Sequence, residues 1–179
     1  MLAQQTIREI EKVNNYEKVW KIKTNRAKFQ IIPILRTKTE PIIINQDNYE
    51  YEREGKALGL IITTNGFHKH IRNRINLAKL QLRILFRFRN LSIKNKKKLY
   101  HALVKSVLEY PPVPLHVASK SLTQQMQIVQ NKAARIITNI RLREGQTNQT
   151  VNELAGLDPI NISLHNQAST ISSKLDNFH

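Results

Sequence analysis

The sequence contains no cysteine, only five glycines, and fewer than half as many acidic as basic residues. Without cysteine, neither a disulfide framework nor a cysteine-based zinc site can form. The scarcity of glycine argues against a glycine-rich loop that would hold a phosphate group. No apolar run approaches the roughly 20 residues that a membrane span requires, and the first residues show no signal-peptide pattern. We therefore expect an intracellular protein that is not secreted.

The charge of the chain is strongly one-sided. Its 179 residues include 29 Lys or Arg and 13 Asp or Glu, which gives a net charge of +16 and an isoelectric point of about 10.3. No acidic residue occurs from Gly55 through Leu108. Such a balance favours a polyanionic partner, either nucleic acid or an anionic membrane surface.

The clearest pattern lies in residues 68–110, which predict two helices joined by a polar break at residues 90–92. On a wheel of about 100° per residue, the first helix has two apolar faces and a basic strip between them. The first face holds Ile71, Ile75, Ala78, Leu82, Leu85 and Phe86, and the second holds Leu77, Leu80, Ile84 and Phe88. The strip holds Arg72, Asn76, Lys79, Arg83 and Arg87. We predict a helix that is packed on two sides and basic on the third, although a simple solvated face is the common alternative.

The second helix of this pair is predicted to begin at the N-cap Ser92. Its core positions are expected at Leu99, Leu103, Val107 and Tyr110. Prolines at positions 111, 112 and 114 end the helix and predict a stiff linker. The candidate nucleic-acid contacts of the pair are Arg72, Lys79, Arg83, Arg87, Lys94, Lys96, Lys97 and Lys98.

The flanking segments predict an α+β protein that is mostly helical. A helix is expected over residues 2–20, a strand over 29–35, a hairpin over 41–54, and one buried strand over 56–64 with Gly59 in its middle. Beyond the linker, Ser121 is expected to cap a helix that ends near Asn139, followed by a short helix near 150–155 with Gly156 as its C-cap and a weak helix from 158.

Two patterns could suggest a metal site. Glu50, Glu52 and Glu54 share one face of a predicted strand, and His68 and His70 lie two residues apart. Carboxylates that fan out along an edge do not converge on a cation, and no third ligand accompanies the histidines. We therefore expect no metal site and no catalytic residue in this chain.

Eight segments in order resemble the C-terminal part of reverse transcriptases from non-LTR (LINE-type, jockey-like) retrotransposons. They are WKIKTNRAK (20–28), PIIIN (41–45), ALGLII (57–62), HKHI (68–71), LSIKNKKKLY (91–100), VLEY (107–110), IVQNKAARIITN (128–139) and TVNELAGL (150–157). The resemblance runs from about residue 20 to about residue 160.

The resemblance implies a small antiparallel palm remnant with a primer-grip-like strand in residues 1–66, a basic thumb-like helical pair in 67–110, and a post-thumb helical region in 111–179. It places Leu58, Gly59 and Leu60 at the primer grip. The family's adjacent catalytic aspartates, which hold Mg²⁺, are not matched, because the only aspartates are Asp47, Asp158 and Asp176. The resemblance thus implies a fragment of an RNA-directed DNA polymerase that is inactive alone, holds no cofactor of its own and works in the nucleus.

Three partner hypotheses follow from these observations. The first is an RNA–DNA or other duplex bound through its phosphates, with the missing fingers and palm as a protein partner. The second is a stand-alone basic module for RNA or DNA, without any link to polymerisation. The third, association with a membrane surface, ranks last because the apolar faces are expected to be committed to a core.

Overall fold

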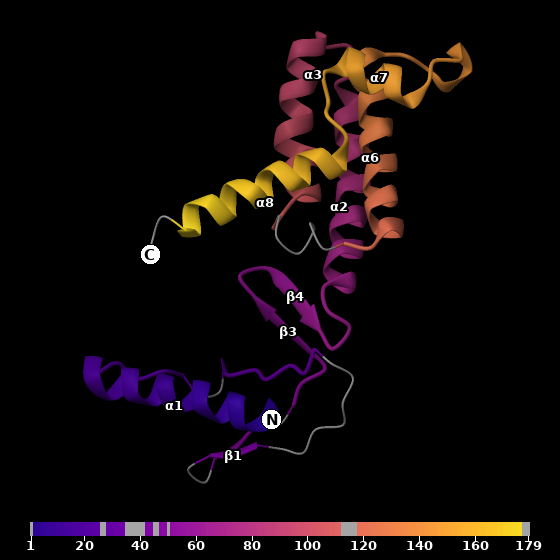
Figure 1. The fold of residues 1–179 in the computed structure, drawn as a ribbon. Coiled ribbons are helices and arrows are strands. Elements are labelled where there is room, and N and C mark those ends of the chain that lie inside the picture. Colours follow the sequence, from indigo (N-terminus) through magenta and orange to yellow (C-terminus); the bar gives the residue numbers. More distant parts are fainter. Residues whose placement is uncertain are drawn as a thin grey trace. The chain divides into compact units, whose positions relative to one another are not determined.

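The computed structural model describes residues 2–25, 28–34, 42–44, 47–49, 51–111 and 118–176. The chain divides into two compact units, Met1–Gly66 and Phe67–His179 (Figure 1). Helices dominate the described residues, and two small antiparallel hairpins accompany them, which confirms the expected α+β class.

The N-terminal unit opens with α1 (Leu2–Trp20), which has the predicted bounds. Ile10 on this helix is buried and packs against Phe29 and Tyr51. A hairpin is present in the region predicted next, as β1 (Ile42–Ile44) paired with β2 (Asp47–Tyr49), but β2 begins earlier and ends earlier than the predicted second strand over 49–54. The strand expected over 29–35 is reduced to a single bridge between Ile31 and Tyr51, and its end at residue 35 lies outside the described residues.

The predicted strand over residues 56–64 is wrong, because this segment turns back on itself. It forms a second hairpin of β3 (Glu54–Ala57) and β4 (Leu60–Thr63), with Ala57 opposite Leu60. Leu58 and Gly59 form the two-residue turn, with φ of +49° and +78°. Two successive positive φ angles are typical of a type I′ turn, which matches the twist of the paired strands. Gly59 therefore serves a tight turn and not the interior of a buried strand.

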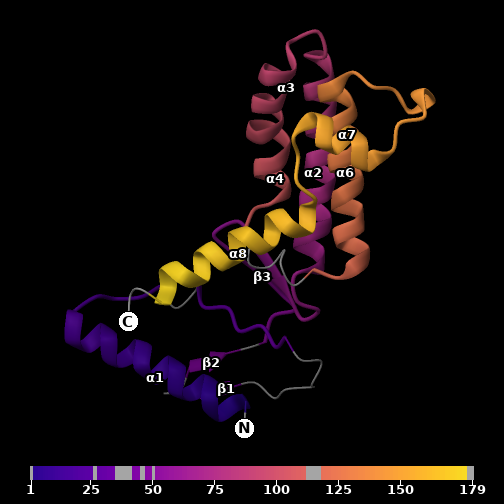
Figure 2. The same ribbon diagram turned by 45° about the horizontal axis from the view of Figure 1, so that its top comes forward.

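The C-terminal unit is helical. Its elements are α2 (His68–Arg87), α3 (Ile93–Leu99), the π-helical η2 (Tyr100–Lys105), α4 (Ser106–Leu108), α6 (Lys120–Thr138), the 3₁₀ turn η3 (Leu142–Glu144), α7 (Asn148–Ala155) and α8 (Ile160–Asp176). Helices α2 and α6 lie side by side, and α3, η2 and α4 return along α2 (Figures 1 and 2). Residues 67–110 and 118–176 thus share one core, and the boundary expected after Tyr110 does not separate two bodies.

The face of α2 that was predicted to be apolar packs into the core of this unit, with one exception. Its buried apolar residues on that helix are Ile71, Ile75, Ala78, Leu82 and Leu85. Phe86 was expected on the same face, but 52% of its side chain is exposed. Phe86 lies close to the wheel position of the basic strip, about 100° from Leu85, so it is carried out of the core.

The second helix of the pair buries a different face from the predicted one. Its buried positions are Lys96, Tyr100, Val104 and Leu108, whereas Leu99, Leu103 and Val107 pack only at the edge of the core. Both sets are four residues apart, so their spacing does not distinguish them. Packing of η2 and α4 against α2, and of α3 against α6, decides which set is buried.

The helix ends follow capping rules, but one of the predicted capping residues is wrong. Ser119, and not Ser121, caps α6, because its Oγ accepts a hydrogen bond from the backbone N–H of Leu122 at 3.4 Å. Asn139 and Gly156 close α6 and α7 in the left-handed conformation that helix ends favour. Ser92 caps α3 as predicted.

A buried polar network holds the helices of this unit in register. The hydroxyl of Tyr100 donates to Gln130 Oε1 at 3.2 Å, and Gln130 Nε2 donates to Asn152 Oδ1 at 3.2 Å and to the carbonyl of Asp158 at 2.8 Å. Asn152 Nδ2 in turn donates to Asn131 Oδ1 at 2.7 Å. Burial raises the pKa of Tyr100 well above its usual range, and the Glu109 carboxylate adds to the effect.

Candidate nucleic-acid interface

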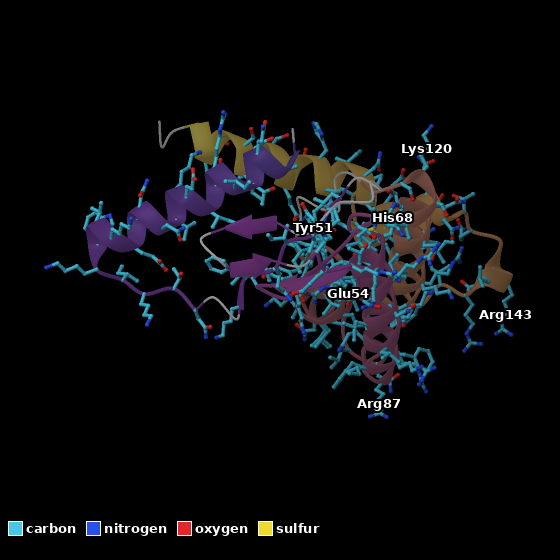
Figure 3. All side chains as sticks on the ribbon, turned by 90° about the horizontal axis from the view of Figure 1, so that it is seen from below. Tyr51, Glu54, His68, Arg87, Lys120 and Arg143 are labelled. Atoms are coloured by element: carbon cyan, nitrogen blue, oxygen red, sulfur yellow. The ribbon has the colours of Figure 1, made fainter. Side chains whose placement is uncertain are left out.

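Four basic side chains form a ridge along one side of α2. The basic ridge consists of Arg72, Lys79, Arg83 and Arg87. All four are exposed, and Figure 3 shows Arg87 reaching outward from the helical unit. Within the described residues none of them forms an ion pair. The ridge is therefore free to meet anionic groups.

The spacing of the ridge makes it self-repelling. Lys79, Arg83 and Arg87 are four residues apart, and like charges at this spacing destabilise a helix by about 0.2–0.5 kcal/mol per pair. Residues 67–179 contain 18 Lys or Arg and five Asp or Glu, so this unit carries a net charge of +13. A row of phosphates would relieve this repulsion.

The only acidic residue between residues 55 and 143 is withdrawn from the surface. Glu109 is buried, its Oε2 accepts hydrogen bonds from Ser163 at 3.2 Å and from Gln167, and Lys105 Nζ lies 3.8 Å away. Burial raises the pKa of this carboxyl, and Lys105 opposes the rise. Glu109 therefore does not neutralise the exposed basic residues.

The second apolar face of α2 is exposed, contrary to the prediction that this helix is packed on two sides. The exposed fractions are 45% for Leu77, 51% for Leu80, 39% for Ile84 and 43% for Phe88. The contacts of α2 within its unit, with α6, η2 and α4, serve the core face. An apolar stripe thus runs beside the basic ridge and is not committed to a core.

Two of the four lysines predicted as contacts on α3 are exposed. Lys94 and Lys98 are exposed, as expected of surface contacts. Lys97 is half-buried, and its Nζ donates to the carbonyl of Gly156 at 2.6 Å.

The prediction that Lys96 is a surface contact is wrong. It is fully buried, and its Nζ donates to Asn139 Oδ1 at 2.9 Å and to the carbonyl of Arg89 at 3.3 Å. Burial lowers its pKa. The side chain points inward because Lys96 is four residues before Tyr100 on the buried face. Lys96 ties the end of α2 to the end of α6 and is not a surface contact.

The three primer-grip-like residues lie in the N-terminal unit, at the tip of the β3–β4 hairpin. Leu58 is 95% exposed, and Leu60 is half-buried at the start of β4. A turn with both residues at positive φ presents backbone groups rather than a flat strand.

The glutamate and histidine patterns noted in the sequence do not form a group of three metal ligands among the described residues. In the parts of the chain that the structure describes, no group of three His, Asp or Glu side chains could hold a metal ion, and Glu50 lies outside those parts. His68 is exposed, whereas His70 is buried with its Nε2 3.2 Å from the carbonyl oxygen of Tyr110. Among the described helices, none has the length and apolar character to cross a membrane.

A cleft that the sequence did not predict lies at the C-terminal ends of α2 and α6. Its volume is about 780 Å³, and its basic lining residues are Arg89, Arg135 and Arg141. The lining also includes Phe86 and Leu142. These residues come from segments about 50 positions apart in the chain, so no local spacing reveals them. The one available signal was the excess of arginine near both helix ends.

No protein-family model, curated protein or solved structure matches this chain. Its class therefore rests on its own geometry, which is that of a strongly basic helical unit following a small unit of one helix and two antiparallel hairpins.

Proposed function

We propose that the helical unit binds nucleic acid through its phosphate backbone, with the basic ridge as the principal contact. The observation that carries this proposal is the row of four exposed, unpaired cations on α2, in a stretch without any exposed acid. Lys94 and Lys98 extend the set of contacts. Phosphate contacts position a protein without reading sequence, so binding is expected to be insensitive to base sequence and steeply dependent on salt.

The proposal extends to the origin of the chain. Together with the resemblance of eight ordered segments, this surface supports a palm-end and thumb part of a retrotransposon RNA-directed DNA polymerase. Its duplex partner would be a primer–template in the nucleus, and the fingers and palm that carry the catalytic aspartates and Mg²⁺ would be its protein partner. The chain alone is expected to bind without incorporating nucleotides.

The test is a titration of the purified chain with an RNA–DNA primer–template across a salt series. The double variant Arg83→Ala/Arg87→Ala should weaken binding equally for several sequences. Because about one counterion is released per phosphate contact, the slope of log affinity against log salt should fall by about 2.

The matched control removes two charges from other helices. Lys132 on α6 and Lys174 on α8 are both exposed, so Lys132→Ala/Lys174→Ala lowers the net charge equally. If both double variants lose the same affinity, binding follows net charge alone and the ridge is not the contact surface. Nucleotide incorporation by the chain would overturn its assignment as a part without catalytic aspartates.

A stand-alone RNA- or DNA-binding module is the second candidate. The observation that favours it is the single core shared by residues 67–111 and 118–176. This core is separate from the apolar cluster around Ile10 in the N-terminal unit. Equal affinity for structured RNA, double-stranded DNA and primer–template would support it over the polymerase origin.

A further inference from the structure

We infer that the cleft at the ends of α2 and α6 is a second binding site, separate from the basic ridge, for one nucleotide whose base is unpaired. The chemistry it recognises is a flat ring joined to a phosphate, either as a free nucleotide or as the unpaired end of a strand. The cleft's volume of about 780 Å³ lies within the roughly 300–1,000 Å³ typical of small-molecule sites.

The phosphate half of the site is formed by arginines. The guanidinium of Arg135 is held in place, because its Nη2 donates to the carbonyl of Gln146 and to Asn148 Oδ1, both at 3.0 Å. Its Nη1 is buried and has no hydrogen-bond partner within the described residues. Because Nη1 is closed to solvent, Arg135 contributes a fixed positive charge at the wall of the cleft, and direct contact with a ligand falls to the exposed lining residues. Arg141 on the same lining is exposed and adds a second positive charge.

No acid among the lining residues competes for these arginines. The nearest along the chain is Glu144, whose Oε1 accepts a hydrogen bond from the backbone N–H of Arg141 at 3.0 Å. That carboxylate caps the short η3 turn. Arginine is well suited to phosphate because its planar donors match the oxygens of the ligand.

The base half of the site is apolar and aromatic. Phe86 is 52% exposed, although other residues of α2 are buried in the core of the unit. The guanidinium of Arg89 lies 4.8 Å from the centroid of its ring. Leu142 is 77% exposed on the same lining. An aromatic ring held by an arginine is a stacking platform for a base. An ion without a ring would leave this apolar lining in water, so the lining selects a nucleotide over a simple anion.

The experiment is calorimetric titration of the full chain with AMP, adenosine and inorganic phosphate. AMP should bind at least about fivefold more tightly than either half alone, because stacking and phosphate contacts both contribute. Arg141→Gln and Phe86→Leu should each weaken AMP binding at least about fivefold. Their matched controls are Arg143→Gln, an exposed neighbour outside the lining, and Phe88→Leu, the next exposed aromatic on α2.

Several results would overturn the inference. They are the absence of AMP binding, equal binding of AMP and inorganic phosphate, and equal effects of each variant and its control. Circular dichroism of each variant verifies folding, and should Phe86→Leu fail to fold, Arg141→Gln and its control still decide. Arg83→Ala/Arg87→Ala should leave AMP binding unchanged, so failure of the ridge and failure of the cleft are distinguishable.

A short unpaired oligonucleotide separates the two sources of the ligand. Tighter binding of four-nucleotide oligo(dA) than of AMP, lost in Arg141→Gln, would assign the site to a strand end. Equal affinity for the two would assign it to the free nucleotide. Oligonucleotide binding that is insensitive to both cleft variants would contradict the strand-end form of the site.

Discussion

Replacing Tyr100 by phenylalanine tests the buried polar network that holds the helical unit together. The change removes one hydroxyl from a fully buried residue and leaves Gln130 Oε1 without its donor at 3.2 Å. A buried acceptor that loses its partner costs about 1–2 kcal/mol. For a domain near the size of this unit, that free energy lowers the melting temperature by about 4–12 °C.

The assay is urea unfolding followed by far-UV circular dichroism, which reports the helices. Fluorescence of the single tryptophan, Trp20, would report the N-terminal unit instead. Tyr16→Phe is the matched control. Tyr16 is 56% exposed, so loss of its hydroxyl leaves no buried acceptor without a donor. It should leave the unfolding midpoint unchanged.

Tyr100→Phe should also change how the stability of the protein depends on pH in the alkaline range. Because burial raises the pKa of Tyr100 above its ordinary value of 10.0, the unfolded chain releases this proton first as the pH rises. The stability of the native protein therefore falls above about pH 10, and Tyr100→Phe escapes this loss. The deficit of the variant should be about 1 kcal/mol smaller at pH 11 than at pH 9. A deficit of zero at neutral pH, or one that is independent of pH, would refute the role assigned to the hydroxyl.

Three further substitutions test other features of the helical unit. Lys96→Ala should cost about 2–4 kcal/mol in urea unfolding because it removes buried packing and two hydrogen bonds, whereas exposed Lys98→Ala should cost less than about 0.5 kcal/mol; equal costs would contradict the burial of Lys96. Burial raises the pKa of Glu109 above 4.5, so native stability should fall as the pH rises above that value, and Glu109→Gln should abolish this fall between pH 4 and pH 7. Gly156→Ala, at a φ of +64°, should lower the melting temperature by an amount equivalent to about 1–2 kcal/mol. Gly145→Ala shares the positive φ but meets no neighbour, so any larger loss for Gly156→Ala reports its contact with Lys97.

The sequence by itself determined the helices with strong periodicity and clear ends. The bounds of α1, the buried positions Ile71, Ile75 and Leu85, and the C-caps Asn139 and Gly156 all follow from local rules of spacing and capping. The exposed basic ridge could be predicted for the same reason, since four cations on one helical strip need only the wheel. These features depend on residues that are close in the chain.

Tertiary structure decided which faces are covered, because burial depends on neighbours that are distant in the chain. The wheel found the stripe that contains Leu77 and Ile84, but nothing local shows that it stays exposed among the described residues. Lys96 belongs to a run of lysines that looks like surface, yet packing of α3 against α6 turns its side chain inward to reach Asn139, 43 residues away. The cleft between Phe86 and Arg141 likewise exists only because two helices end side by side. Local patterns fix where a helix can be apolar or charged, and only packing decides which of those surfaces meets water.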